Sequence, residues 1–116
     1  MSDYSPLFYD GDPFTCTAAT DVTGGRLVTV AGNRTVGHAA ADSNPIGVAA
    51  FDAKAGESVN VIPGGVHRPA ASGAIAAGAR VAAAAGGTVS ATGTNFIGTA
   101  LTAAADGELV EIKLDH

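Results

Sequence analysis

The chain has 116 residues and a net charge of −5, and although 47% of its residues are hydrophobic, only 5% are aromatic. This length fits one domain, and the small side chains predict a thin core that association with further copies would stabilise. The acidic surface disfavours a nucleic-acid partner, the single cysteine excludes an intrachain disulfide, and the absence of a long apolar run leads us to expect a soluble protein with no membrane span or export signal.

The first segment, YSPLFYDGDPF (residues 4–14), carries both tyrosines and two of the four phenylalanines. Prolines and a glycine interrupt it, so we predict an extended arm over residues 1–19, ahead of one all-β domain over residues 20–116. The arm either folds back over the domain's own core or docks on a partner protein. We favour a partner, because aromatic side chains on an aromatic-poor chain suit binding. The candidate binding residues are Tyr4, Pro6, Leu7, Phe8, Tyr9 and Phe14.

Glycines separate short apolar runs after the arm, and long segments with helical spacing are missing, which predicts strands. The alanine-rich segment GAIAAGARVAAAAGG favours a helix by propensity, but its glycines limit any helix to a turn or two. In the last run, charged Glu111 and Lys113 alternate with apolar residues, so one face should be exposed to water. The expected strands are 26–31, 35–39, 46–51, 58–62, 65–69, 79–84, 88–91, 97–101 and 108–114.

The chain contains an internal repeat. The segment IGVAAFDAKAGESVNV (46–61) aligns with IGTALTAAADGELVEI (97–112) at an offset of 51, with seven identities in sixteen positions. With a small gap, residues 24–36 align with residues 77–89. We therefore predict two copies of a three- or four-strand unit, over about 24–66 and 77–116. Each copy contains a tight turn in which a glycine precedes a glutamate that begins the next strand.

Lys54 lies near the tip of the first of these turns, where carrier domains hold a covalently attached cofactor. Its counterpart in the second copy is Ala105, and its neighbours Ala53 and Ala55 lack the bulky apolar side chains that usually surround a carrier lysine. We therefore predict a solvent-exposed turn residue and no cofactor.

No residues have the spacing of a catalytic or metal site. Asp10 and Asp12 supply too few oxygen ligands for calcium, and Cys16 has no neighbouring base, so we expect it to be a small buried strand residue. The glycine-rich segments lack the lysine of a phosphate-binding loop. The three histidines lie apart, without partners at ligand spacing: His38, His67 and His116. We therefore expect neither a metal site nor an enzyme.

His67 and Arg68, in the segment GGVHRP, are candidate interface residues. They lie at the end of an expected strand, just before a proline. The alternative for His67 is a half-exposed strand residue, which we favour.

The arm, the segment TAATDVTGGRLVTVAG, the two repeat segments and GGVHRPAASGAIAAGARV, in this order and spacing, resemble the capsid decoration or cement proteins of tailed bacteriophages. The resemblance runs over nearly the whole chain. It implies a small antiparallel β-barrel or sandwich of β-tulip type, which assembles as a homotrimer where neighbouring subunits of the major capsid protein meet. It implies no enzymatic activity and no cofactor.

From this resemblance we expect a late structural protein of the virion. It would be made in the host cytoplasm, would bind the outer surface of the expanded capsid, and would stabilise the shell against the pressure of packaged DNA. The alternatives are a monomeric β-sandwich binding module or another structural component of the head or tail. A binding module normally shows Trp or Tyr on a strand face, whereas this chain has no Trp and carries both tyrosines in the arm.

Overall fold

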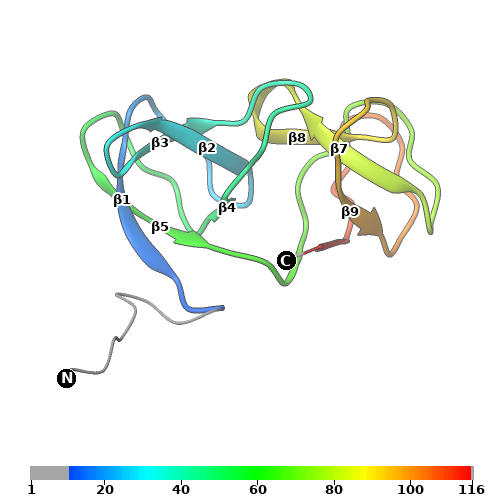
Figure 1. The fold of residues 1–116 in the computed structure, drawn as a ribbon. Helices are drawn as coiled ribbons and strands as arrows, with labels where there is room; N and C mark the ends of the chain where they lie inside the picture. The colour runs from blue at the N-terminus through cyan, green and yellow to red at the C-terminus, as the bar shows by residue number, and fades with distance from the viewer. Residues whose placement is uncertain (1–10, 116) are drawn as a thin grey trace.

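The computed structural model describes residues 11–115, which form ten β-strands and one short 3-10 helix. A closed barrel has the strand order β1-β3-β2-β4-β5, and a second sheet beside it has the order β6-β10-β9-β7-β8 (Figure 1). The barrel strands are β1 (Phe14–Ala18), β2 (Leu27–Gly32), β3 (Thr35–His38), β4 (Gly47–Ala49) and β5 (Ser58–Ile62). The second sheet has β6 (Val66–His67), β7 (Arg80–Ala84), β8 (Thr88–Ser90), β9 (Phe96–Ala100) and β10 (Ile112–Leu114), with η1 (Ala85–Gly87) between β7 and β8. The predicted all-β fold is confirmed.

All nine expected strands are present, and most of their ends differ from the prediction by one or two residues. The alanine-rich segment forms β7, whose residues 81–84 are buried, and the positive φ angles of Gly86 and Gly87 end the extended run. The last strand is shorter than expected, because only 112–114 pair as β10. Its predicted alternation is present, with Ile112 and Leu114 buried and Lys113 exposed.

A tenth strand, β1, lies in the segment that we assigned to the arm. Phe14–Ala18 pairs with β5 in antiparallel fashion and, at Thr17 and Ala18, with β3 in parallel fashion. The arm boundary at residue 19 was therefore placed too late, because the barrel begins at Phe14. The alternation that marks this strand, with Cys16 and Ala18 buried between exposed threonines, is carried by small side chains that give a weak sequence signal. Below, the arm means residues 1–13.

The predicted repeat is also present in the backbone hydrogen bonds. Ala18 N–H donates to Glu57 O at 2.9 Å, and its counterpart Ala71 N–H donates to Glu108 O at 2.8 Å. The parallel pairing of Ala18 with Val36 recurs as an isolated bridge between residues 71 and 89. Residues ahead of the gap in the repeat alignment correspond at an offset of 53, so that Ala18 matches Ala71. Residues after the gap correspond at an offset of 51, so that Glu57 matches Glu108. Each copy therefore also contains a strand ahead of the segments that the sequence alignment matched.

The two copies share part of their core. One buried cluster lies within the barrel, but the other joins Leu27, Ala39 and Val48 of the first copy to the buried side chains of the second. Gly87 lies at this contact, where a Cβ atom would be 2.6 Å from the carbonyl oxygen of Leu27. The halves are thus packed directly against each other.

Candidate binding surface

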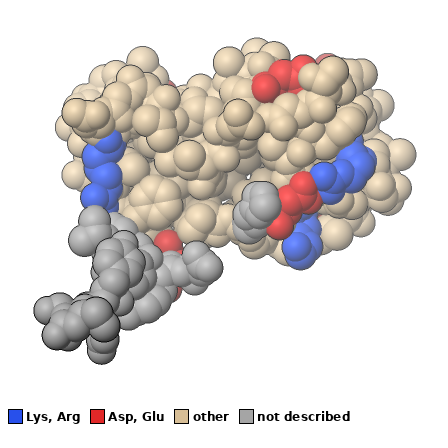
Figure 2. Space-filling view, in the orientation of Figure 1, with Lys and Arg blue, Asp and Glu red and all other residues tan. Residues whose placement is uncertain are grey.

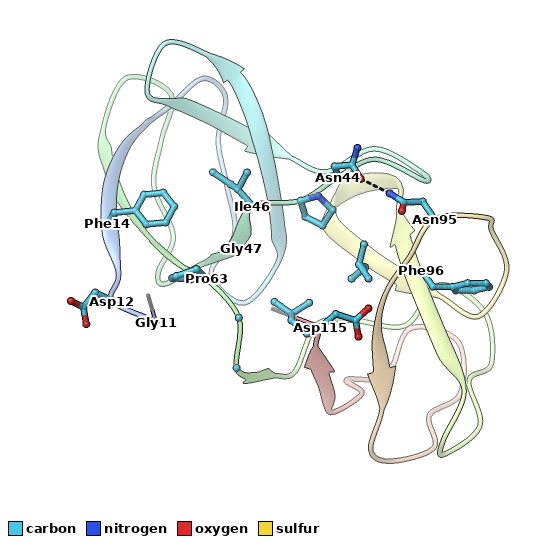
Figure 3. A pocket seen from close by; sticks show the side chains of 15 residues that line it. Gly11, Asp12, Phe14, Asn44, Ile46, Gly47, Pro63, Asn95, Phe96 and Asp115 are labelled. Atoms are coloured by element: carbon cyan, nitrogen blue, oxygen red, sulfur yellow. Dashed lines mark hydrogen bonds between the residues drawn. The ribbon is translucent and has the colours of Figure 1, made fainter. Parts of the chain in front are cut away.

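A cleft of about 890 Å³ lies between the two halves. Equivalent parts of the two copies line it: residues 44–47 and 95–97 from the segments that enter β4 and β9, and residues 63–65 and 114–115 from the ends of β5 and β10 (Figure 3). The cleft thus follows the pseudo-symmetry of the chain. The face in Figure 2 is mostly uncharged, and its charged side chains lie mainly towards the two ends.

Hydrogen bonds join the two halves at the edge of the cleft. The equivalent residues Asn44 and Asn95 meet there, and Asn95 Nδ2 donates to Asn44 Oδ1 at 2.6 Å (Figure 3). Asn95 Nδ2 also donates to the carbonyl oxygen of Ser43 at 3.1 Å. The carboxylate of Asp42 accepts hydrogen bonds from the backbone N–H groups of Thr94 and Asn95, at 3.0 and 3.2 Å. The backbone of Asn95, then that of Thr94, lowers the pKa of Asp42 below its usual value.

The described chain begins at the cleft. Gly11 and Asp12 line it, and the ring of the half-buried Phe14 projects into it from β1 (Figure 3). On the opposite wall, the side chain of Phe96 points away from the cleft and is 40% exposed. Of the six candidate binding residues, the structure places Phe14 alone, and it lies in β1. The other five lie outside the described residues: Tyr4, Pro6, Leu7, Phe8 and Tyr9.

His67 and Arg68 lie on and directly after the short edge strand β6. His67 is half-buried, as predicted, and its Nε2–H donates to the carbonyl oxygen of Gly64 at 2.6 Å. Arg68 is exposed and has no hydrogen bond or ion pair within residues 11–115, although the strand register places it opposite Glu111. The structure therefore leaves the guanidinium of Arg68 accessible to a partner.

One backbone edge of β6 is open. Leu114 N–H donates to Gly65 O and Val110 N–H donates to Pro69 O, both at 2.9 Å. Because alternate residues of an antiparallel strand face opposite sides, the backbone groups of Val66 and Arg68 point away from β10. In the described part of the chain, β10 is the strand that pairs with β6, and Val66 is 54% exposed.

The equivalent edge of β1 is protected. Pro13, the counterpart of Val66, has no N–H group, and Arg34 Nε–H donates to the carbonyl oxygen of Thr15 at 2.9 Å. The counterpart of Arg34 in the second copy is Gly87, which has no side chain to cover the edge. Proline and covering side chains are usual means of blocking strand addition. Within residues 11–115 the two copies therefore differ in one respect that matters for binding, because the second leaves this edge uncovered and the first does not.

The remaining sequence candidates offer no assembled chemistry. Lys54 is exposed beside its turn, and Cys16 is buried, as predicted for both. His38 Nε2 accepts a hydrogen bond from Thr23 N–H at 2.9 Å, and burial, together with the charge of Arg26, lowers its pKa. Within residues 11–115, no three His, Cys, Asp or Glu side chains are grouped to hold a metal ion. No helix in that range is long and apolar enough to span a membrane.

The sequence interpretation missed the cleft. Its signal was present in the repeat, because Asn44 and Ile46 align with Asn95 and Ile97. Equivalent positions do not have to meet in space, however, and only the packing of the two halves brings these residues to one place.

A small β-fold that consists of a closed barrel and a second sheet, with a cleft between its halves and an open strand edge, has the features of a binding and assembly module. The model of the phage cement protein family matches residues 9–114, and the chain belongs to this family. The crystal structure of the N base of the head fiber protein gp8.5 of bacteriophage phi29 is similar, with a TM-score of 0.76 and 27% sequence identity over 90% of this chain and 93% of that one. No curated protein matches the chain. The predicted resemblance is confirmed, and the chain is a structural protein of a phage head.

Proposed function

We propose that the chain binds the outer surface of the expanded capsid and cements the shell against the pressure of packaged DNA. A ligand that binds only the expanded state stabilises it by RT ln(1 + [L]/Kd), about 2.7 kcal/mol per site at a free concentration 100 times Kd. Membership of the phage cement family is the observation that carries this proposal. The proposed role involves no enzymatic step and no cofactor.

The arm is the proposed contact with the major capsid protein. It concentrates Tyr4, Leu7, Phe8 and Tyr9 directly before a domain that has few aromatic residues. Aromatic side chains dominate the energetics of protein interfaces because they bury a large area at a low entropic cost. Phe14, at the start of β1, and Pro6 complete the proposed capsid-binding set.

We place the contact between copies of the chain at β6. Its uncovered backbone edge, the exposed Val66 and the accessible Arg68 would accept a neighbouring copy, with His67 at the end of the interface. A homotrimer assembled in this way presents three arms to the shell, and linked weak contacts act as one strong attachment.

Deletion of residues 2–10 tests the role of the arm without removing any strand. We expect the variant to lose co-sedimentation with empty expanded heads of the parent phage while its circular dichroism spectrum stays that of a folded all-β chain. The matched control is Leu109→Ser, which removes an apolar side chain that is 64% exposed and lies far from the arm in the sequence. Undiminished binding by the deletion variant would show that another surface contacts the capsid.

A second candidate function is the base of a head appendage. It is favoured by the similarity to the N base of a head fiber protein. Heating full heads with and without bound chain separates the two functions, since a cement raises the temperature of DNA release. A base that only attaches an appendage binds the heads and leaves this temperature unchanged.

A further inference from the structure

The cleft between the two halves has several apolar side chains in its walls and is large enough to hold several side chains. Its apolar lining includes Phe14, Ile46, Pro63, Ile97 and Leu114, and its volume of about 890 Å³ lies near the upper end of the 300–1,000 Å³ that is typical of ligand pockets. Covering apolar surface of this kind with apolar groups lowers the free energy of the protein in water.

Three of the polar side chains that line the cleft already have partners within the chain. The amide of Asn95 donates to Asn44 and to Ser43, and the carboxylate of Asp115 forms a two-point ion pair with Arg80 at 2.6 and 2.8 Å. An occupant is therefore not required to satisfy these groups. The apolar part of the cleft wall is suited to an apolar segment.

The chain continues from the wall of this cleft into such a segment. Gly11 lines the cleft, and the three residues Leu7, Phe8 and Tyr9 precede it by two to four positions. At about 3.3–3.6 Å per extended residue, these side chains are tethered within roughly 7–14 Å of Gly11. A short tether corresponds to a millimolar effective concentration, which favours this segment over the same segment of a second copy at micromolar concentration.

We propose that residues 7–9 dock into the cleft of their own chain when the protein is free in solution. This inference does not depend on the proposed function. If the arm also binds the capsid, the shell and the cleft compete for the same side chains. Docking then keeps the aromatic segment covered until the protein binds the shell.

The fluorescence of the chain makes this proposal directly testable. The chain has no tryptophan, and its two tyrosines are Tyr4 and Tyr9, so tyrosine emission reports on the arm alone. In the Tyr4→Phe variant, Tyr9 is the one emitter. We expect acrylamide to quench Tyr9 several-fold less in this variant than in a synthetic peptide of residues 1–12 that carries the same substitution.

Two further variants in the Tyr4→Phe background locate the protection. Ile97→Glu places a charge in the cleft and should raise the quenching of Tyr9 to that of the peptide, whereas Leu109→Glu, at an exposed position outside the cleft lining, should not. Ile46→Glu repeats the test from the opposite wall if Ile97→Glu does not fold. Quenching equal to that of the peptide in the Tyr4→Phe chain overturns the proposal. Protection that is lost on dilution also overturns it, because the occupant is then the arm of a second copy.

Discussion

Two glycines at equivalent positions of the repeat are required by a close approach of backbones. Gly47 and Gly98 follow the isoleucine of the recurring Ile-Gly-x-Ala sequence. A Cβ atom at Gly47 would lie 2.5 Å from the carbonyl oxygen of Ile62, and one at Gly98 would lie 2.6 Å from that of Lys113. The obstacle in each case is the adjacent strand, which cannot move without disturbing the sheet. Both copies of the repeat therefore have a glycine at this position for a steric reason.

Gly98→Ala should destabilise the fold by about 1–3 kcal/mol, the usual cost of overpacking a close contact. The matched control is Gly32→Ala in β2, where the new methyl group would meet no atom nearer than 3.7 Å and the residue does not need a positive φ. Urea unfolding of the two variants beside the parent chain measures both effects. Equal stability of the two variants would contradict the steric role of Gly98.

The turn glutamates of the repeat have equivalent roles too. Glu57 Oε1 accepts a hydrogen bond from Lys54 N–H at 2.8 Å, and Glu108 Oε1 accepts one from Ala105 N–H at 2.8 Å. Lys54 therefore contributes its backbone to the turn, and alanine serves equally well at the equivalent position. This is the structural reason why both copies of the repeat have the glutamate but only the first has the lysine.

Among the connecting elements, the segment before β4 holds the two halves together. Asp42 N–H donates to Ala83 O at 2.9 Å, and its carboxylate accepts from the segment before β9. A Cβ atom at Gly93 would lie 2.5 Å from Asp42 Oδ1, so a glycine is needed for this approach. These hydrogen bonds fix the position of the segments that line the cleft.

The contribution of Asp42 to stability should disappear in acid. Its folded-state pKa lies below the ordinary value of 3.8, so the ionised carboxylate stabilises the fold above that value, and the stabilisation is lost as the pH falls through the lowered pKa. We expect Asp42→Asn to melt at a lower temperature than the parent chain at pH 7 and the difference to shrink between about pH 4 and pH 2. A difference in melting temperature that stays constant over this range would contradict the role of the carboxylate.

The sequence predicts the elements better than their assembly. Periodicity and glycine spacing place nine strands, because the side chains of β5 and β10 alternate clearly between buried and exposed. The sequence pattern does not reveal β1, because the buried and exposed residues that alternate in this strand are the small residues Cys, Ala and Thr. It also does not predict the parallel pairing of β1 with β3. Such pairing and the cleft depend on contacts between residues that are distant in sequence, and local patterns do not encode these contacts.

Viewed as a whole molecule, the chain consists of two similar halves with one important asymmetry. Both halves contain the same hydrogen-bonded unit, and they share a core through Leu27 and its neighbours. The first half protects its outer strand with Pro13 and with the hydrogen bond from Arg34 to Thr15. The second half has Val66 and Gly87 at the positions of Pro13 and Arg34. The shared core requires Gly87, because no side chain fits against Leu27, so the lack of a covering side chain at this position follows from the way in which the halves pack.

The proposed trimer can be tested by giving β6 the protection that β1 already has. Val66→Pro introduces the residue found at the equivalent Pro13, and the N–H group that it removes points away from β10, so the pairing of β6 with β10 should survive. Light scattering should give the mass of a trimer for the parent chain and for Val66→Thr, which keeps the N–H group, and the mass of a monomer for Val66→Pro. A trimer in Val66→Pro would exclude this edge as the interface, and a monomeric parent chain would exclude the trimer in solution.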